Sequence, residues 1–320
     1  MKSLIFGALG QDGMFLSEEL LLKGDDVYGF VRNGSETQTP NGINGVTYIS
    51  GDLLDRDLIE HTIDKYDPDF IYNLASFSSV KSSFDFPDLS EQINYRFVEI
   101  VLQILRERQD KNKRPIKFFQ ASSSEMFGPN PQGPLHENSE FNPQSPYALH
   151  KYQAHKSAIR FREEYEIPVY TAILFNHESH RRKPTFASRK ITLGAFEIAS
   201  GKRDYLSLGN IDSLRDWGYA GDYVKAMLMI MKNGIPDDFV VATGELHSLR
   251  EICQIAFTMV GLGNYQPFIT IDQDLIRKND TIGLVGNTNK INNLIGWKPI
   301  TSFTEMIAIM IKHEGVHRKY

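Results

Sequence analysis

The sequence predicts an α/β protein: a doubly wound parallel sheet with a smaller C-terminal region interleaved with it. Short apolar runs alternate with amphipathic stretches through the first half of the chain. This alternation is typical of strand–helix–strand units whose helices cover both faces of a sheet. The chain has 320 residues, and at about 150 residues per domain this length allows about two domains.

Six strands and four helices are expected in the first half. The strands cover residues 3–6, 26–31, 46–49, 69–74, 116–121 and 168–175, and the helices cover residues 12–22, 55–66, 89–108 and 146–165. The run 70–74 is apolar at nearly every position, as expected of a strand that is buried on both faces.

The alternation stops after residue 175, where a polar and basic stretch covers residues 176–190. A helix over 191–200 and a strand over 239–242 are expected beyond it. We therefore expect a first domain over residues 1–175, with later returns to its sheet near 205–245. A smaller cap region is expected over residues 176–204 and 246–320.

Charge and composition exclude several classes of protein. There are 35 Lys and Arg residues against 40 Asp and Glu residues, whereas a nucleic-acid or membrane-surface binder requires a basic face. The one cysteine, Cys253, cannot form an internal disulfide. No apolar run approaches the roughly 18 residues of a spanning helix, and the N-terminus carries no signal-like segment. We expect a cytoplasmic protein that binds neither membranes nor nucleic acid.

A glycine-rich turn follows the first expected strand. Gly7, Gly10 and Gly13 are spaced three residues apart, directly before an amphipathic helix. Glycines allow a tight turn and a close approach of the backbone, and a helix N-terminus offers N–H groups to a pyrophosphate. Three glycines alone are a weak signal, but their position between a first strand and a helix predicts a Rossmann-like dinucleotide site.

The residues after the second strand bear on which dinucleotide would bind. An acidic residue there would bond a free ribose 2′-hydroxyl, whereas this chain has Arg32 and Ser35, which suit a 2′-phosphate. We therefore expect NADP rather than NAD; an exposed loop arginine is the alternative. Asp52, after the third strand, is either placed to reach the adenine amino group or an ordinary turn residue.

Tyr147 and Lys151 form the candidate catalytic pair. A capping serine and a proline mark the start of their helix, on which two residues four apart share a face. There an ammonium can lower the pKa of the phenol and make the tyrosine a usable base. The spacing alone is not selective, because Tyr152 and Lys156 repeat it.

Ser123 and Glu125 follow the expected strand 116–121, at the edge where open α/β sheets bind ligands. A hydroxyl beside a tyrosine base can orient a substrate alcohol, and a nearby carboxylate can move a second proton. A polar strand end without a catalytic role is the alternative. No His-Glu-x-x-His frame occurs and Cys253 has no partner, so we expect no metal site.

Longer motifs carry a family resemblance. They are Gly10-Gln11-Asp12-Gly13, Gln120-Ala121-Ser122-Ser123-Ser124-Glu125, Ser145-Pro146-Tyr147, Leu174-Phe175-Asn176-His177-Glu178-Ser179, Arg215-Asp216-Trp217-Gly218 and Ala242-Thr243-Gly244-Glu245. Together with the glycine turn, they resemble the GDP-mannose 4,6-dehydratases, which are extended short-chain dehydrogenases/reductases. The resemblance covers nearly the whole chain.

The resemblance implies a GDP-sugar 4,6-dehydratase that uses NADP. Tyr147 would take the proton of the sugar 4-hydroxyl while the C4 hydride leaves for NADP, with Ser123 holding the hydroxyl and Lys151 tuning Tyr147. Glu125 would remove the C5 proton and help expel the C6 hydroxyl as water before the hydride returns to C6. GDP-mannose is the first expectation. Another GDP-hexose such as GDP-N-acetylglucosamine, an epimerase or 4-ketoreductase activity, and a non-catalytic nucleotide sensor stay open.

Positions that match the family's pattern imply further contacts with the cofactor and the substrate. Cofactor contacts are implied for Gly7, Gly10, Gln11, Asp12, Gly13, Arg32, Ser35, Asp52, Leu53, Leu74, Ala75, Ser76, Ser78, Tyr147, Lys151, His177 and Arg182. Substrate contacts are implied for Ser76, Ser123, Glu125, Asn176, Lys190, Arg215, Arg277 and Asp280.

Two departures from the family pattern matter. Residues 277–280 differ from the Arg-Pro-x-Glu pattern of the family, which leaves the identity of the sugar open. The loop after Arg32 is shorter than the family's, where it helps to join a tetramer. We therefore expect a homodimer, with a homotetramer as the alternative.

Overall fold

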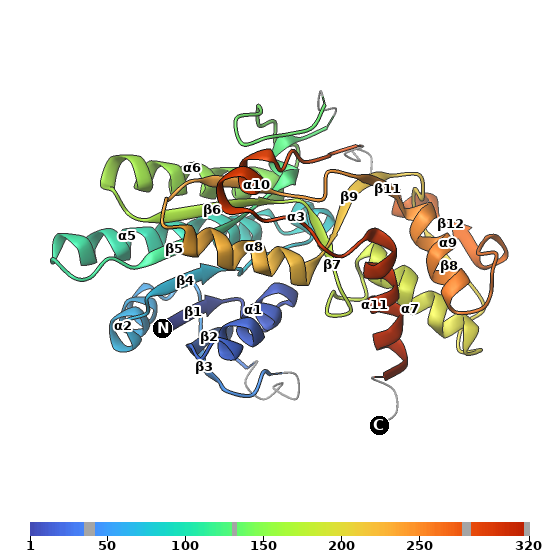
Figure 1. Cartoon of the computed structure of the whole chain (residues 1–320), viewed down its shortest axis with the longest axis horizontal. Coiled ribbons are helices and arrows are strands. Elements are labelled where there is room, and N and C mark those ends of the chain that lie inside the picture. The colour runs from blue at the N-terminus through green and yellow to red at the C-terminus, as the bar shows by residue number, and fades with distance from the viewer. Residues whose placement is uncertain (35–41, 130–132, 277–282, 317–320) are drawn as a thin grey trace. The chain divides into compact units, whose positions relative to one another are not determined.

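The computed structural model describes residues 1–34, 42–129, 133–276 and 283–316 (Figure 1). It confirms the predicted α/β class. Two compact units make up the chain. The first holds the described residues of 1–128, 137–174 and 224–239, and the second holds the described residues of 129–136, 175–223 and 240–320.

A seven-stranded sheet runs through the described residues in the order β10-β6-β5-β4-β1-β2-β3. Its strands are β1 (Lys2–Phe6), β2 (Asp26–Arg32), β3 (Val46–Gly51), β4 (Phe70–Asn73), β5 (Lys117–Ser123), β6 (Val169–Leu174) and β10 (Asp238–Val241). Pairing is parallel from β3 through β1 and β4 to β6. The order reverses between β1 and β4, and ligands of doubly wound sheets bind at the carboxyl edge of such a switch point.

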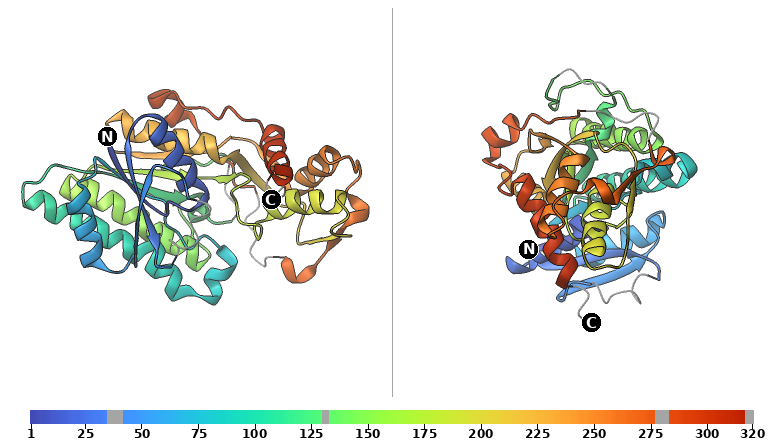
Figure 2. Two further views of the ribbon diagram at one scale, coloured as in Figure 1. Left: turned by 90° about the horizontal axis from the view of Figure 1, so that it is seen from below. Right: turned by 90° about the vertical axis from the view of Figure 1, so that its right-hand side faces the viewer.

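Helices cover both faces of this sheet. On one face, α2 (Arg56–Tyr66), α5 (Phe97–Asp110) and α6 (Pro146–Tyr165) share an apolar core with the inward side chains of β1 and β5. On the opposite face lie α1 (Gln11–Leu22) and α8 (Ala220–Asn233), as Figure 2 shows. This double cover explains why the strands are apolar at successive positions, since both of their faces are buried.

The elements expected in the first half occur close to their predicted bounds. Each expected strand begins and ends within two residues of an observed one. The helix expected over 89–108 is wrong in detail, because it is divided into α4 (Pro87–Glu91), a π-helical turn (Gln92–Arg96) and α5, after the short α3 (Val80–Asp85). The π-helical turn carries Asn94, which is 1% exposed and bonded to the loop after β4.

The second unit has its own sheets and core. A three-stranded sheet has the order β11-β9-β7 and a two-stranded sheet pairs β12 with β8, within the part of the chain that the structure describes. The strands are β7 (Asn176–Glu178), β8 (Leu206–Leu208), β9 (Leu214–Tyr219), β11 (Leu246–Ser248) and β12 (Ile269–Ile271). The helices are α7 (Ala187–Ala199), α9 (Leu249–Met259), α10 (Asn289–Ile295) and α11 (Phe303–Val316), with 3-10 turns at Gln266–Phe268 and Gln273–Leu275. Helices α7, α9 and α11 pack on one apolar cluster that includes Cys253, and burial raises the pKa of this thiol to about 12.

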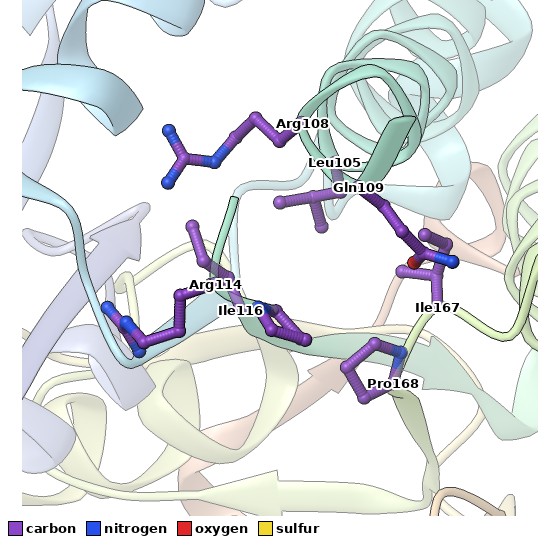
Figure 3. A pocket seen from close by; sticks show the side chains of 8 residues that line it. Leu105, Arg108, Gln109, Arg114, Ile116, Ile167 and Pro168 are labelled. Atoms are coloured by element: carbon purple, nitrogen blue, oxygen red, sulfur yellow. The ribbon is translucent and has the colours of Figure 1, made fainter. Parts of the chain in front are cut away.

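Two further findings concern membrane-spanning helices and a surface pocket. No helix among the described residues combines the length and apolar character needed to cross a membrane. A small pocket between α5 and the segments that precede β5 and β6 is lined by Arg108, Arg114 and Ile167, among others (Figure 3). It therefore lies at the amino end of the strands, whereas Ser123 ends β5 at the carboxyl edge.

Candidate active site

The glycine turn joins β1 to α1 and leaves no room for side chains. Gly7 has a φ of +87°, and a Cβ atom there would lie 2.8 Å from the backbone nitrogen of Ala75. A Cβ atom on Gly13 would lie 2.3 Å from the Gly7 carbonyl oxygen. Gly10 is the N-cap residue of α1, so the N-terminus of the helix begins at this turn. This is the backbone cradle that a pyrophosphate requires.

Ser123 and Glu125 lie on a sharp turn at the end of β5. Ser123 is the last residue of the strand and is 8% exposed, and the 3-10 turn Ser124–Phe127 follows it. The Ser123 hydroxyl accepts a hydrogen bond of 3.3 Å from the Glu125 N–H group. Glu125 is half-buried. One short turn therefore carries both side chains at the carboxyl edge of the sheet.

Tyr147 and Lys151 lie one turn apart on α6. Both are buried, at 9% and 4% exposed. The Lys151 ammonium donates a bond of 2.9 Å to the carbonyl oxygen of Ala121 on β5, and it lies 6.0 Å from the centre of the Tyr147 ring. Burial lowers the pKa of Lys151 to about 8, and the Asp12 carboxylate of the glycine turn opposes that shift. Asp12, at the start of α1, and Lys151, on α6, therefore lie in the same unit.

The loop after β4 is held by a residue that the sequence reasoning did not find. Asn94 accepts bonds of 2.8 Å from the Ser76 hydroxyl and 3.0 Å from the Phe77 N–H group, and it donates to the Phe77 carbonyl oxygen. The Ala75 N–H group of this loop donates a bond of 3.2 Å to the side-chain oxygen of Asn73, the last residue of β4. Asn94 stands among other polar residues, Gln92 and Arg96, so no signal in the sequence distinguished it. The implied cofactor residues 74–78 therefore form an ordered segment next to the glycine turn.

The implied adenosine contacts lie at the ends of two neighbouring strands. Arg32 ends β2 with an exposed side chain, and it is paired across the sheet with Gly51, the residue before Asp52. The Asp52 carboxylate accepts a bond from the Leu54 N–H group, and Leu53 is half-buried between them. Ser35 lies outside the described residues.

The remaining implied residues belong to the second unit. Asn176 and His177 are on β7, and the Nδ1 atom of His177 bonds the Phe175 carbonyl oxygen at 2.7 Å. The guanidinium of Arg182 lies 3.9 Å from the centre of the Phe186 ring and pairs with Glu178. The sites of Arg277 and Asp280 are outside the described residues.

Lys190 and Arg215 are cations in or near the interior of the second unit. Burial lowers the pKa of Lys190, which is on α7. Arg215, on β9, is 7% exposed and donates to the Ser213 hydroxyl and the Leu214 carbonyl oxygen. A guanidinium is suited to bind a phosphate or a sugar diphosphate.

Comparison with known proteins identifies the family. A family model described as GDP-mannose 4,6 dehydratase matches residues 4–310. The chain belongs to the GDP-mannose 4,6-dehydratase family. Among curated relatives, GDP-mannose 4,6 dehydratase 1 of Arabidopsis thaliana is 38% identical over 98% of this chain and 89% of its own length. The GDP-mannose 4,6 dehydratase of Homo sapiens is 35% identical over 97% of this chain and 90% of its own length.

Solved structures share the fold of this family member. UDP-glucose 4-epimerase from Thermotoga maritima superposes with a TM-score of 0.87 at 21% identity, over 99% of each chain. dTDP-glucose 4,6-dehydratase from Bacillus anthracis, in complex with NAD, has a TM-score of 0.85 at 19% identity and covers 100% of this chain and 98% of its own. The family and the fold that the sequence motifs predict are both confirmed.

Proposed function

We propose that the chain is a GDP-mannose 4,6-dehydratase that converts GDP-mannose to GDP-4-keto-6-deoxymannose and water. The observation that carries the proposal is the end of β5: Ser123 is the last residue of the strand, Glu125 lies on the 3-10 turn that follows, and α6 contacts the same strand through Lys151. A plain epimerase or reductase needs no carboxylate beside the serine. Membership of the family supports the same activity.

The glycine cradle fits a nicotinamide dinucleotide, because added Cβ atoms at Gly7 and Gly13 would fill it. When bound, this cofactor supplies the acceptor for the hydride of C4 and the donor that returns it to C6. The Ser123 hydroxyl orients the 4-hydroxyl group of the sugar, and the Tyr147 phenolate accepts its proton. The Lys151 ammonium stabilises that phenolate.

Elimination is the task of Glu125. The 4-keto group acidifies the C5–H bond, so a carboxylate can remove the C5 proton and deliver it to the departing C6 oxygen, which leaves as water. After the hydride reaches C6, C5 regains a proton, which balances the one that Tyr147 accepted. The net change is the loss of one water molecule, and the cofactor ends in its original oxidation state.

NADP is the proposed cofactor. Arg32 is exposed at the end of β2, beside the edge where the adenosine ribose would lie, and a guanidinium is suited to a 2′-phosphate. The test is equilibrium binding of NADP and NAD to the wild type and to Arg32→Ala. We expect the substitution to weaken the binding of NADP and to leave the binding of NAD unchanged. Tighter binding of NAD than of NADP by the wild type would contradict the proposal.

The sugar is recognised, in this proposal, by Asn176, Lys190 and Arg215 of the second unit, with Arg277 and Asp280 as further candidates. Purified protein should be incubated separately with GDP-mannose and with GDP-N-acetylglucosamine, and the products weighed by mass spectrometry. We expect loss of water from GDP-mannose. Loss of water from GDP-N-acetylglucosamine alone would reassign the substrate, and an intact mass for both would contradict a dehydratase of either sugar.

A homodimer is the proposed assembly. Phe84, Phe86 and Leu89 on and between α3 and α4, together with Leu149 on α6, are 58%, 58%, 42% and 43% exposed, respectively. These helices pack against one another, so the four apolar side chains share one region of the first unit. Burial of such a patch would favour association. Sedimentation of the wild type and of Phe86→Ser tests this: we expect a dimer that the substitution weakens, and a monomeric wild type would contradict it.

A further inference from the structure

We infer that His155, on α6, is a positioning residue of the proposed site. Its side chain contacts the end of β5, which carries Ser123, and supports the turn that carries Glu125. The inference rests on the proposed function, because it assigns a role in that reaction to a residue outside the catalytic set. Two separate contacts of the imidazole ring carry it, one for each catalytic side chain.

The first contact fixes α6 to β5. The Nδ1 atom of His155 lies 3.0 Å from the hydroxyl oxygen of Ser122, and both residues are buried, at 1% and 2% exposed. One helical turn earlier, Lys151 bonds the carbonyl oxygen of Ala121. Successive turns of the helix are therefore bonded to successive residues of the strand, directly before Ser123. The helix that carries Tyr147 cannot slide along β5 without breaking both bonds.

The second contact supports the turn of Glu125. The rings of His155 and Phe141 form a T-shaped pair, with ring centres 5.4 Å apart and planes at 73°. Phe141 stacks in turn on Phe127, the last residue of the 3-10 turn, with centres 4.9 Å apart. The next residue, Asn142, donates its N–H group to the carbonyl oxygen of Met126 at 2.9 Å. One intervening ring thus separates His155 from the turn that sets the direction of Glu125.

The environment of His155 argues against acid–base or nucleophilic chemistry. Burial lowers the pKa of the imidazole to about 4, while the nearby Asp238 carboxylate opposes this shift and Arg162 and Lys156 add to it. Asp238 is engaged by Arg162 at 2.9 Å and by the Thr171 hydroxyl at 2.7 Å. A neutral, enclosed ring beside a buried serine cannot reach a substrate. Its contacts are suited to holding two elements in register.

The two contacts can be separated by substitution. His155→Asn keeps an amide near the position of Nδ1, so it can still bond Ser122, but it removes the ring from Phe141. His155→Phe keeps a ring against Phe141 and loses the bond to Ser122. Ser122→Ala is the milder change that removes the same bond. Thr171→Val is the control, because it removes a partly buried side-chain hydrogen bond, to Asp238, from the adjacent strand at a position that pairs with Gln120 and not with Ser122 or Ser123.

Single-turnover mixing with GDP-mannose, followed by the absorbance of reduced nicotinamide, distinguishes oxidation at C4 from the later elimination. We expect His155→Phe and Ser122→Ala to slow the oxidation by about 10- to 100-fold, the loss that a misplacement of about 1 Å produces. We expect His155→Asn to oxidise C4 and then to accumulate reduced cofactor, since the Glu125 turn alone has lost support. Cofactor affinity should stay within about twofold of the wild type in all three, and Thr171→Val should react as the wild type does.

Two results overturn different claims. If the wild type dehydrates GDP-mannose and the His155 and Ser122 variants react as Thr171→Val does, the positioning role of His155 is wrong while the proposed function stands. Equal slowing of oxidation and elimination in both His155→Phe and His155→Asn would also contradict the role, because the proposed role assigns the Ser122 contact to oxidation and the Phe141 contact to elimination. If the wild type oxidises and dehydrates no GDP-hexose, both the function and the role are wrong.

Discussion

Substitution of Gly13 by alanine tests how the glycine turn works. A Cβ atom at this position would lie 2.3 Å from the Gly7 carbonyl oxygen and 2.7 Å from the Cα atom of Ala8, whereas real Cβ atoms essentially never approach closer than 3.0 Å. The turn must therefore move by at least 0.7 Å, the difference between 3.0 Å and 2.3 Å. Because the opposing atoms are backbone atoms, rotation of a side chain cannot relieve the overlap.

Two opposing contributions determine whether this substitution raises or lowers the free energy of unfolding. Overpacking of this kind costs about 1 to 3 kcal/mol, and the upper end applies here because the clash is with backbone. Replacing glycine by alanine inside a helix stabilises the helix by about 1 kcal/mol. We expect Gly13→Ala to lower the free energy of unfolding by about 2 kcal/mol. We expect it to weaken NADP binding by about 30-fold, which corresponds to about 2 kcal/mol, because the glycine turn has moved.

The assay combines urea unfolding of the apo protein with NADP titration by fluorescence. Gly24→Ala is the control: its φ is +77° and nothing lies within 4 Å of the added Cβ atom. It should cost about 1 kcal/mol of stability through backbone strain and leave NADP affinity unchanged. A Gly13→Ala protein that is more stable than the wild type, or that binds NADP equally well, would refute the reasoning.

Three further substitutions have distinct expected outcomes. Glu125→Gln should abolish the loss of water while cofactor affinity is retained, and measurable dehydration would remove Glu125 from the mechanism. Lys151→Met should be inactive yet more stable at pH 7 by about 3 kcal/mol, because the pKa of Lys151 is about 8 when folded and 10.5 as a free side chain, and each unit is worth about 1.4 kcal/mol. Between these two pKa values the unfolded wild-type chain binds more protons than the folded one, so the free energy of unfolding of the wild type should rise with pH across that range. The free energy of unfolding of Lys151→Met should not rise in this way. Asp216→Asn should destabilise the protein by about 3 kcal/mol, as seen in urea unfolding, because the buried carboxylate accepts bonds from the backbone N–H groups of Thr243, Gly244 and Gly286; an unchanged midpoint would contradict this.

Periodicity and glycine placement predicted the sheet because they reflect local rules. Strands buried on both faces must be apolar at successive positions, and a tight β1–α1 turn requires glycine, so the first half was predicted nearly to the residue. The helix expected over 89–108 was wrong in detail. The π-helical turn around Asn94 is stabilised by bonds to the loop at Ser76 and Phe77, and a contact between residues so distant in sequence leaves no periodic signal.

The candidate site shows the same division. The sequence predicted Tyr147 and Lys151 on one helical face and Ser123 at a strand end, because each depends on spacing within one element. The supporting contacts were not predicted. His155 bonds a serine that lies 33 positions away and packs on a loop phenylalanine, and only the folded chain brings these elements together.

The most direct test of the proposed reaction follows one hydrogen atom. GDP-mannose labelled with deuterium at C4 should be incubated with the protein and a catalytic amount of NADP, and the product analysed by mass spectrometry and NMR. We expect that one water molecule is lost, that the deuterium is found at C6, and that no net reduction of NADP accumulates. Recovery of the sugar with its deuterium still at C4 and its mass unchanged would contradict the account.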